Sequence, residues 1–405
     1  MKNENNKKIL ILTSFFYPEQ NTSAILPSEL AFEFAKEAYD ITALVGYPKE
    51  YVKAGTVVPK KETVNGVKIS RLKYTGFNRH SVLGRIANIL SFSLAVFFKP
   101  SYFRKADVVI TITNPPLLPY IVALHCRFFH KKLITYIFDL YPDVAVNLGY
   151  LSATSKIAKV FNVFYKTVFK VSDKVVAISG DMKEYLHATK SLPYEKLQVI
   201  HNWYNDIKPD STYIVPATPS KENPLTIIYG GNMGEAQDMD TLLEAVKILK
   251  NDERFKFILV GQGSQKEKIK DYIVENQLSN CLLHDYVPKD EYDKMSEAAS
   301  LGVLSLKSVI KGLGSPSKLY SYLATKKPVI AILPEGMDIG EAITSHNVGL
   351  VVANGESQKI ADFLKGCAED TNKLNEMAEN GYKLFKDNYT LEKSFEKYKA
   401  LVEEI

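Results

Sequence analysis

Lys318 and the residues before it have the types and spacing expected of a phosphate-binding segment. A stretch that contains Gly314, Pro316 and Ser317 leads directly into a helical pattern that begins at Lys318. The first amides of a helix have no partners within it, so a cation and several backbone donors meet at this point. We expect Lys318 to be exposed and to bind a diphosphate directly.

Two glycine-rich turns precede this segment, and each follows a β-rich run. The first is Gly230-Gly231-Asn232, and the second contains Gly261 and Gly263. Glycine lacks a side chain, so backbone amides in such turns approach a phosphate closely. One such turn is common in α/β proteins, whereas two in succession indicate a nucleotide site. Further candidates for the same site are Tyr286, Val287 and Ser321.

The first half of the chain offers fewer groups for chemistry. Tyr17, Pro18 and Glu19 follow the first apolar run, at a junction of strand, loop and helix that suits an anion or a sugar. Asp139 follows a later apolar run. We interpret it either as a polar group that binds a substrate and assists catalysis or as a cap of its loop.

No residues form a convincing metal site. The seven histidines lack ligand spacing, and the three cysteines, Cys126, Cys281 and Cys367, lie far apart. Asp238-Met239-Asp240 has the form of a metal-binding Asp-x-Asp, but it stands at an expected helix start, where aspartate caps are common. We therefore predict neither a metal nor another cofactor.

The order of elements predicts an α/β fold with two Rossmann-like, doubly wound parallel-sheet domains, because β-rich runs alternate with helix-length segments throughout. The runs of the first half are Lys8–Ser14, Ile41–Val45, Asp107–Thr111, Leu133–Phe138, Lys174–Ile178 and Leu197–His201. Those of the second half are Leu225–Tyr229, Lys256–Val260, Cys281–His284, Leu301–Leu304 and Pro328–Ile332. Ligands of such sheets bind beyond the carboxyl ends of the strands, so we expect the chemistry in a cleft across which the two domains face each other.

We place the domain boundary in a polar, proline-containing linker. The N-terminal domain spans residues 1–204, the linker residues 205–224 and the C-terminal domain residues 225–390. The linker contains four prolines and no sustained periodicity. Residues 391–405 predict a helix that crosses back to the first domain.

The charge is distributed unevenly along the chain. Residues 1–205 hold 27 lysines and arginines against 15 acidic residues, whereas residues 206–405 hold 24 against 31. The basic first half, residues 1–205, is therefore expected to face an anionic partner. Because no nucleic-acid-binding motif accompanies this charge, a membrane surface is the favoured partner. The polar start of the chain contains no signal-peptide pattern, which favours a cytoplasmic location.

One apolar segment, residues 82–98, is a candidate for contact with the inner face of the cell membrane. It is shorter than the roughly 20 residues that span a bilayer. Arg85, Asn88 and Ser91 form a narrow polar stripe along it, and Arg79 precedes it. This pattern predicts an interfacial helix whose Phe92 and Phe97 contact lipid. A second segment, Lys156–Lys170, is either a similar helix or an ordinary packed amphipathic one.

The glycine-rich turns and the Lys318 segment, in this order and at these separations, resemble family 4 of the retaining GT-B glycosyltransferases. Pro316-Ser317-Lys318 resembles the O-antigen and capsule branch, which includes N-acetylfucosamine transferases. Asp139-Leu140-Tyr141-Pro142 resembles the Asp-Leu-aromatic-Pro segment of that branch. The resemblance spans essentially the whole chain.

The resemblance implies that the second domain binds a nucleotide-sugar donor, expected to be UDP-linked, and that the first binds the acceptor. It implies transfer with retention and without a metal, from a donor such as UDP-N-acetylfucosamine to a lipid-linked saccharide. No carboxylate pair suits a double displacement. The implied reaction therefore proceeds on one face of the sugar, with amides and Lys318 stabilising the leaving diphosphate.

The sequence departs from this family at four places, one of which is Phe138, where relatives often have a histidine before the aspartate that matches Asp139. Ser321 and Leu313 stand where glutamates are usual, and Glu235-Ala236-Gln237-Asp238 replaces a basic pair, so Lys266 or Lys268 would have to assist Lys318. Two alternatives therefore stay open. The alternatives to a glycosyltransferase are a non-catalytic scaffold or binding member of a polysaccharide assembly complex and a UDP-sugar 2-epimerase on the same fold.

Overall fold

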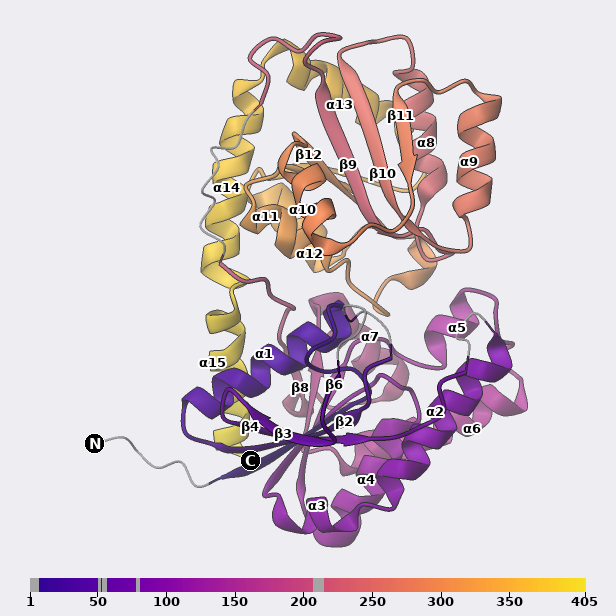
Figure 1. Cartoon of the computed structure of the whole chain (residues 1–405). Helices are drawn as coiled ribbons and strands as arrows, with labels where there is room; N and C mark the ends of the chain where they lie inside the picture. The colour runs from indigo at the N-terminus through magenta and orange to yellow at the C-terminus, as the bar shows by residue number, and fades with distance from the viewer. Residues whose placement is uncertain (1–6, 50–51, 53–56, 78–80, 207–214) are drawn as a thin grey trace. The chain divides into compact units, whose positions relative to one another are not determined.

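The computed structural model describes residues 7–49, 52, 57–77, 81–206 and 215–405 (Figure 1). It divides into two compact units, residues 1–201 with 391–405 and residues 202–390. Each unit contains one sheet flanked by helices, so the predicted pair of Rossmann-like parallel sheets is confirmed. Part of the predicted linker, residues 207–214, and Arg79 lie outside the described residues.

The sheet of the first unit has eight strands in the order β3-β4-β2-β1-β5-β6-β7-β8, parallel except for the β3–β4 pair. Its strands are β1 Lys8–Thr13, β2 Asp40–Gly46, β3 Lys61–Val64, β4 Val67–Leu72, β5 Val108–Ile112, β6 Lys132–Ile137, β7 Lys174–Ala177 and β8 Leu197–Val199. The six predicted strands are confirmed. Their apolar side chains are buried along β1, β5 and β6, as a sheet covered by helices requires.

The sequence analysis missed the edge hairpin of β3 and β4. Asn65 and Gly66 join the two strands with φ angles of 48° and 83°. An Asn-Gly pair with both residues in the left-handed region is the usual two-residue hairpin turn. The signal was therefore present in the sequence.

The helices of the first unit begin at polar caps where the chain supplies them, as with Asn21 before α1 and Ser155 before α6. They are α1 Thr22–Lys36, α2 Val82–Phe97, α3 Pro100–Lys105, α4 Leu118–Phe129, α5 Asp143–Asn147, α6 Lys156–Val171, α7 Gly180–Lys190 and α15 Leu391–Glu404. The terminal helix α15 belongs to this unit. Its Phe395 packs edge-to-face on Phe34 of α1, with ring centroids 5.0 Å apart.

The sheet of the second unit is wholly parallel, in the order β11-β10-β9-β12-β13-β14. Its strands are β9 Leu225–Asn232, β10 Phe255–Gln262, β11 Cys281–His284, β12 Leu301–Ser305, β13 Val329–Ile332 and β14 Gly349–Val352. The five predicted strands are confirmed, whereas β14 was missed. Strands β9 and β10 extend further than predicted, so Gly230, Gly231 and Gly261 lie in paired strand ends and not in open turns.

Helices cover both faces of the second sheet, in the alternation that the sequence predicts. They are α8 Met239–Ile248, α9 Lys266–Glu275, α10 Lys289–Glu297, α11 Lys318–Ala324, α12 Asp338–Ser345, α13 Ser357–Glu369 and α14 Asn372–Asn388. The core between strands and helices is aliphatic, with Ile227, Leu242 and Ile360 fully buried. This rigid core fixes the strand ends that carry the candidate residues.

Candidate functional site

Each sheet has one point where the strand order reverses, and this point lies between β9 and β12 in the second unit and between β1 and β5 in the first. In open α/β sheets, the chain leaves the carboxyl ends of these two strands in opposite directions, which opens a crevice for a ligand. In the second unit, the turn Gly234–Asp238 follows β9 and Lys307 follows β12. Of the donor candidates, Gly230, Gly231 and Asn232 lie at the end of β9, next to this point.

The two glycine-rich segments are bound to each other. Met233 N donates to Gln262 O at 2.8 Å, and Gln265 N donates to Met233 O at 2.9 Å. A Cβ atom on Gly261 would lie 1.8 Å from Gly231 O, and one on Gly263 would lie 2.2 Å from Met233 O. These two glycines therefore allow the segments to pack together, whereas the space beside Gly231 is open.

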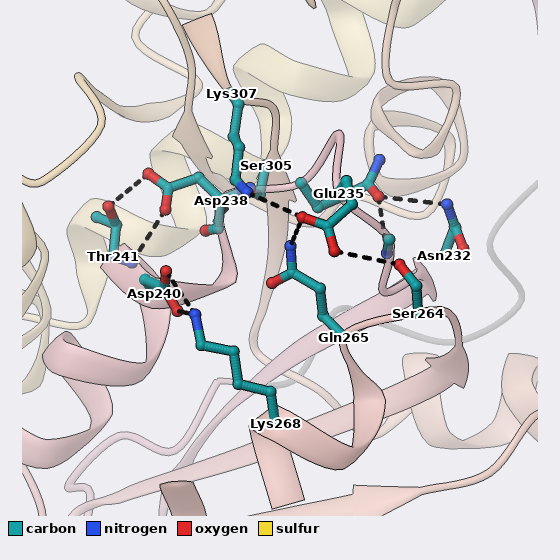
Figure 2. Close-up of polar contacts among 12 residues, drawn as sticks. Asn232, Glu235, Asp238, Asp240, Thr241, Ser264, Gln265, Lys268, Ser305 and Lys307 are labelled. Atoms are coloured by element: carbon teal, nitrogen blue, oxygen red, sulfur yellow. Dashed lines mark hydrogen bonds and ion pairs between the residues drawn. The ribbon is translucent and has the colours of Figure 1, made fainter. Parts of the chain in front are cut away.

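Polar side chains hold the turn after β9 in one shape (Figure 2). Gln237 Oε1 accepts from Gly234 N at 3.1 Å and from Asn232 Nδ2 at 3.3 Å. Asp238 caps α8, because its carboxylate accepts from Thr241 N at 3.2 Å and Thr241 Oγ1 at 2.5 Å. The predicted aspartate cap is confirmed, and it turns the Asp238 carboxylate toward the helix.

Lys307 is a cation at the strand-order reversal that the sequence analysis missed. Its backbone N donates to Ala236 O at 2.8 Å, which joins the end of β12 to the turn after β9. Its Nζ lies 3.6 Å from Glu235 Oε2, which also accepts from Gln265 Nε2 at 2.7 Å (Figure 2). Glu235, which stands where the family often has a basic pair, is therefore paired with the cation Lys307.

The two lysines expected to assist Lys318 bind other groups. Lys266 Nζ donates to Gly261 O at 3.0 Å and contacts Asp285, and Lys268 Nζ lies 2.7 Å from Asp240 Oδ1. Lys266 thus links the end of β10 to the segment after β11, and Lys268 links α9 to the start of α8. Lys307, which pairs with Glu235, follows the reversal strand β12, whereas Lys266 and Lys268 follow β10.

Lys318 is the first residue of the short helix α11, and it is half-buried, in contrast to the expected exposure. Its Nζ lies 4.1 Å from the ring centroid of Tyr292 on α10. Ser321 Oγ donates to Lys318 O at 2.9 Å, so its hydroxyl is engaged with its own helix. Leu313, which stands where the family usually has a glutamate, is fully buried in the core.

The remaining donor candidates occupy the rims of this region. Gly314, Pro316 and Ser317 are half-buried in the loop before α11. Tyr286 is 59% exposed, and Val287 is half-buried. Both follow the edge strand β11, two strands away from β9, and Gln262 Nε2 links this edge to β10 by donating to Asp285 Oδ1 at 2.8 Å.

In the first unit, the loop after β1 is held from two sides. Tyr17 N donates to Ser28 Oγ at 2.8 Å, and Arg71 Nη2, fully buried, donates to Tyr17 O at 3.0 Å. The Tyr17 ring is exposed and Pro18 is half-buried, whereas the Glu19 carboxylate is buried and accepts from Phe16 N at 3.4 Å. Glu19 therefore shapes the loop, and Tyr17 is the group accessible to a ligand.

Asp139 follows β6, next to the reversal strand β5. Thr113 Oγ1 accepts from Phe138 N at 3.0 Å and from Asp139 N at 3.3 Å, which fixes the turn through its backbone. The Asp139 side chain is in contact with solvent, yet protein atoms surround it densely. The resulting loss of hydration raises the pKa of its carboxyl group to about 6.

Two family models match the chain. Residues 28–206 match the model described as Glycosyltransferase Family 4, and residues 211–384 match that described as Glycosyl transferases group 1. Between them, the models span most of both units. The chain is a GT-B glycosyltransferase.

Named relatives agree with this assignment. This glycosyltransferase is 25% identical over 338 residues to a protein named as a probable glycosyltransferase, WbjE of Pseudomonas aeruginosa, covering 82% of this chain and 83% of the relative. It is 24% identical over 257 residues to WcaI of Escherichia coli, which is named for colanic acid biosynthesis, covering 60% of this chain and 62% of WcaI.

Solved structures share the fold of the glycosyltransferase. Sucrose-phosphate synthase from Thermosynechococcus elongatus superimposes with a TM-score of 0.74 at 16% identity, covering 98% of this chain and 99% of that protein. HepE from Anabaena, in complex with UDP and glucose, superimposes with a TM-score of 0.70 at 14% identity, covering 99% and 100%.

The polar stripe predicted along α2 of the glycosyltransferase does not lie on one exposed face. Asn88 Oδ1 accepts from Thr75 Oγ1 at 3.0 Å and Phe77 N at 3.1 Å, and Ser91 Oγ accepts from Thr75 N at 3.1 Å. Two residues of the predicted stripe therefore bind the protein, and only Arg85 is exposed.

The outward face of α2 is apolar. Leu83, Ile86, Leu90, Leu94 and Phe97 are between 43% and 78% exposed. The expectation that Phe92 contacts lipid is wrong, because Phe92 is buried against Tyr74 with ring centroids 5.4 Å apart. Within the described residues, no helix is both long and apolar enough to cross a membrane, and no three metal-ligating side chains cluster.

Proposed function

We propose that this glycosyltransferase transfers a sugar from a UDP-sugar to a lipid-linked saccharide in the synthesis of a bacterial capsule, O-antigen or exopolysaccharide. The observation that carries the donor site is the arrangement at the β9/β12 reversal, where two joined glycine segments lie near Lys307 and Lys318. The UDP in the HepE structure supports the choice of nucleotide, and the name of WcaI supports the pathway class.

The donor diphosphate is proposed to bind beyond the carboxyl ends of β9 and β10. The loop containing Ser317, together with Lys318 and Lys307, would stabilise the negative charge that grows on the leaving diphosphate, and the lack of a side chain at Gly231 would let the diphosphate approach the strand end. Ser321 would supply a hydroxyl to the nucleoside, and Tyr286 with Val287 would line the outer rim. Transfer is proposed to proceed with retention and without a metal, and an N-acetylated deoxyhexosamine is the proposed sugar.

The acceptor is proposed to bind to the first unit, at the loop after β1 and the turn after β6. Tyr17 offers an exposed aromatic face for a sugar, and the Asp139 carboxylate accepts a hydrogen bond from an acceptor hydroxyl. The raised pKa of Asp139 places its loss of a proton just below neutral pH. Its ionised form is therefore the one that would assist transfer at pH 7.

The acceptor's lipid is proposed to be reached at an anionic membrane surface, through α2 and its neighbours. Helices α2 and α6 both border α4 (Figure 1), and α6 exposes Ile157, Val160 and Val163. Helices α2, α3, α4 and α6 contain no acidic residue, but contain Arg85, Arg104, Lys105, Arg127, Lys156, Lys159, Lys166 and Lys170. Exposed apolar side chains on helices whose charged residues are all cations suit the headgroup boundary of an anionic bilayer.

One observation favours a non-catalytic role as the second candidate. Leu313 is buried in the core, and Ser321 replaces a charged group with a hydroxyl that is engaged with its own helix. A protein with these changes could bind a nucleotide sugar without turning it over. Detecting transfer or donor hydrolysis separates the two roles.

Donor binding by titration calorimetry tests the donor site. UDP, GDP, UDP-N-acetyl sugars and UDP-hexoses are titrated into wild type, Lys318→Ala and the control Lys268→Ala, whose lysine pairs with Asp240. We expect UDP compounds to bind wild type and the control, and to bind Lys318→Ala at least tenfold more weakly. Equal affinity of all three proteins would remove Lys318 from the site, and no binding of any nucleotide would contradict the donor site itself.

A further inference from the structure

Tyr292 is part of none of the sequence motifs, yet its ring contacts two of the proposed donor-site residues. Lys318 Nζ lies over the face of the ring, 4.1 Å from its centroid. The edge of the same ring lies beside Gly230, because a Cβ atom on Gly230 would be only 2.2 Å from Tyr292 Cε2 and Oη. The absence of a side chain at Gly230 therefore makes room for the ring.

A second tyrosine fixes the ring to the sheet. Tyr292 Oη lies 3.3 Å from Tyr322 Oη, and Tyr322 Oη donates to Ile228 O of β9 at 3.4 Å. A Cβ atom on Gly302 of β12 would lie 2.5 Å from the Tyr322 ring. The pair of tyrosines is thus seated on the two strands between which the strand order reverses.

The contact between Tyr292 and Lys318 is an electrostatic attraction between a cation and the negative face of an aromatic ring. Burial raises the pKa of the Tyr292 phenol to about 12, so the ring stays neutral at physiological pH. A neutral ring attracts an ammonium group without neutralising it, unlike a carboxylate. The contact can therefore fix where the charge of Lys318 lies.

We infer that Tyr292 is a positioning residue, which holds the Lys318 ammonium group beside the carboxyl end of β9 for the donor diphosphate. The inference rests on the proposed donor site. The inference also explains why residue 230 is a glycine. Its lack of a side chain makes room for the Tyr292 ring, and not for a phosphate. Without the ring, the long Lys318 side chain would sample several rotamers, and ordering it would weaken donor binding.

The first test is the affinity for UDP, measured by calorimetry for a set of variants. We expect Tyr292→Leu to bind UDP about tenfold more weakly than wild type, and Tyr292→Phe, which keeps the ring, to stay within about threefold. In a Lys318→Ala background, Tyr292→Leu should cause no further loss, because the ring acts through that lysine. The control is Tyr272→Leu, since Lys247 Nζ lies 5.7 Å from the Tyr272 ring, outside the site.

Additive losses in the double variant, or a Tyr292→Phe protein as weak as Tyr292→Leu, would overturn the positioning role while leaving the donor site intact. A Lys318→Ala protein with wild-type affinity would instead contradict the proposed donor site. The two failures are therefore distinguishable within one experiment.

The second test needs no nucleotide. Reductive ¹³C-methylation of the lysines gives each dimethylammonium group an NMR signal, and Lys318→Arg identifies that of Lys318. A proton above an aromatic face is shifted upfield, so this signal should be upfield of the exposed lysines in wild type and Tyr292→Phe, and should move to their position in Tyr292→Leu. A signal that does not respond to Tyr292→Leu would refute the contact.

Discussion

The two units share a sheet type and a strand-order reversal, but their helices differ in charge and in exposed apolar surface. Helices α2, α3, α4 and α6 of the first unit carry no acidic residue, whereas α8, α9, α10, α13 and α14 of the second each carry both charges. Exposed large apolar side chains gather on α2 and α6, but stand singly in the second unit, as Ile248 and Val274 do. The sheets of the two units are therefore alike in having one candidate ligand site at the strand-order reversal. The helices differ, because only those of the first unit present a surface that is both apolar and basic.

The two reversal points also differ. In the second unit, backbone segments pack so closely that Gly261 and Gly263 tolerate no side chain. In the first unit, the loop after the reversal strand β1 presents an exposed ring, Tyr17, and the turn after β6, the neighbour of the reversal strand β5, presents a carboxyl group, Asp139. Closely packed backbone beside Lys307 and Lys318 agrees with the proposed binding of a diphosphate, and accessible side chains agree with the proposed binding of a saccharide. Four changes would break or sharpen this contrast.

The largest effect is expected at Lys318, since the second-unit site depends on few cations. Lys318→Ala should lower the transfer rate by about a hundredfold or more, because the proposed donor site loses a cation that would stabilise charge on the leaving diphosphate. The protein should stay folded, because the side chain is only half-buried at a helix start. Transfer assays with circular dichroism check both statements, and full activity would remove Lys318 from the mechanism.

The close packing of the glycine segments is tested by Gly261→Ala. The new Cβ atom would lie 1.8 Å from Gly231 O, so the paired strand ends must separate, at a cost of about 3 kcal/mol in the free energy of unfolding. Gly366→Ala in α13 is the control, because nothing lies near its Cβ position and helix propensity should stabilise it by about 0.5–1 kcal/mol. Urea denaturation measures both; similar values for the two variants would contradict the packing.

The apolar face of α2 is tested by Leu90→Asp combined with Leu94→Asp. Both leucines are exposed, so the double variant should fold, but its binding to vesicles of anionic phospholipid should fall at least about twentyfold. Val274→Asp, at an exposed residue of the second unit, should leave binding unchanged. Vesicle sedimentation at fixed salt measures the loss, and equal binding of all three proteins would place the membrane contact elsewhere.

The smallest effect is expected at Asp139. Its folded pKa of about 6 exceeds the ordinary 3.8, so the folded protein retains this proton between about pH 4 and pH 6, and stability falls as pH rises through that window. Asp139→Asn should therefore raise the free energy of unfolding above pH 6 by up to about 1 kcal/mol, a value reduced for solvent screening.

The same change should affect activity in the opposite sense. The rate constant kcat/KM of wild type should rise with pH through about 6, as the carboxylate forms. Asp139→Asn should lack this rise and be about fivefold slower at pH 7.5. A variant that keeps the wild-type pH profile would assign the rise to another group.

Much of the fold was predictable, because apolar β-rich runs and glycine turns are local signals. Every predicted strand is present, and the missed hairpin of β3 and β4 carries an Asn-Gly turn. The sequence did not predict which face of α2 is buried, because apolar residues lie on nearly every side of the helix. Only the packing of Thr75 on Asn88 and of Tyr74 on Phe92 determines which face is inside.

The site was predictable only where a motif marks it. The glycine segments and Lys318 belong to such motifs, whereas Lys307 and Tyr292 reach the strand-order reversal from separate elements that only the fold brings near it. The position of Lys307 three residues after a predicted strand was a usable signal. The contact of Tyr292 with Gly230 joins residues 62 positions apart in the chain, and no local pattern indicates it.

Sugar transfer itself tests the central claim most directly. Wild type and Lys318→Ala are incubated with each radiolabelled UDP-sugar and anionic vesicles that contain lipid-linked saccharides, and the label in the lipid phase is counted. The account predicts that wild type labels the lipid from one UDP-N-acetyl sugar, and that Lys318→Ala labels it at about 1% of that rate or less. Donor binding without any labelled lipid, or equal labelling by both proteins, would contradict it.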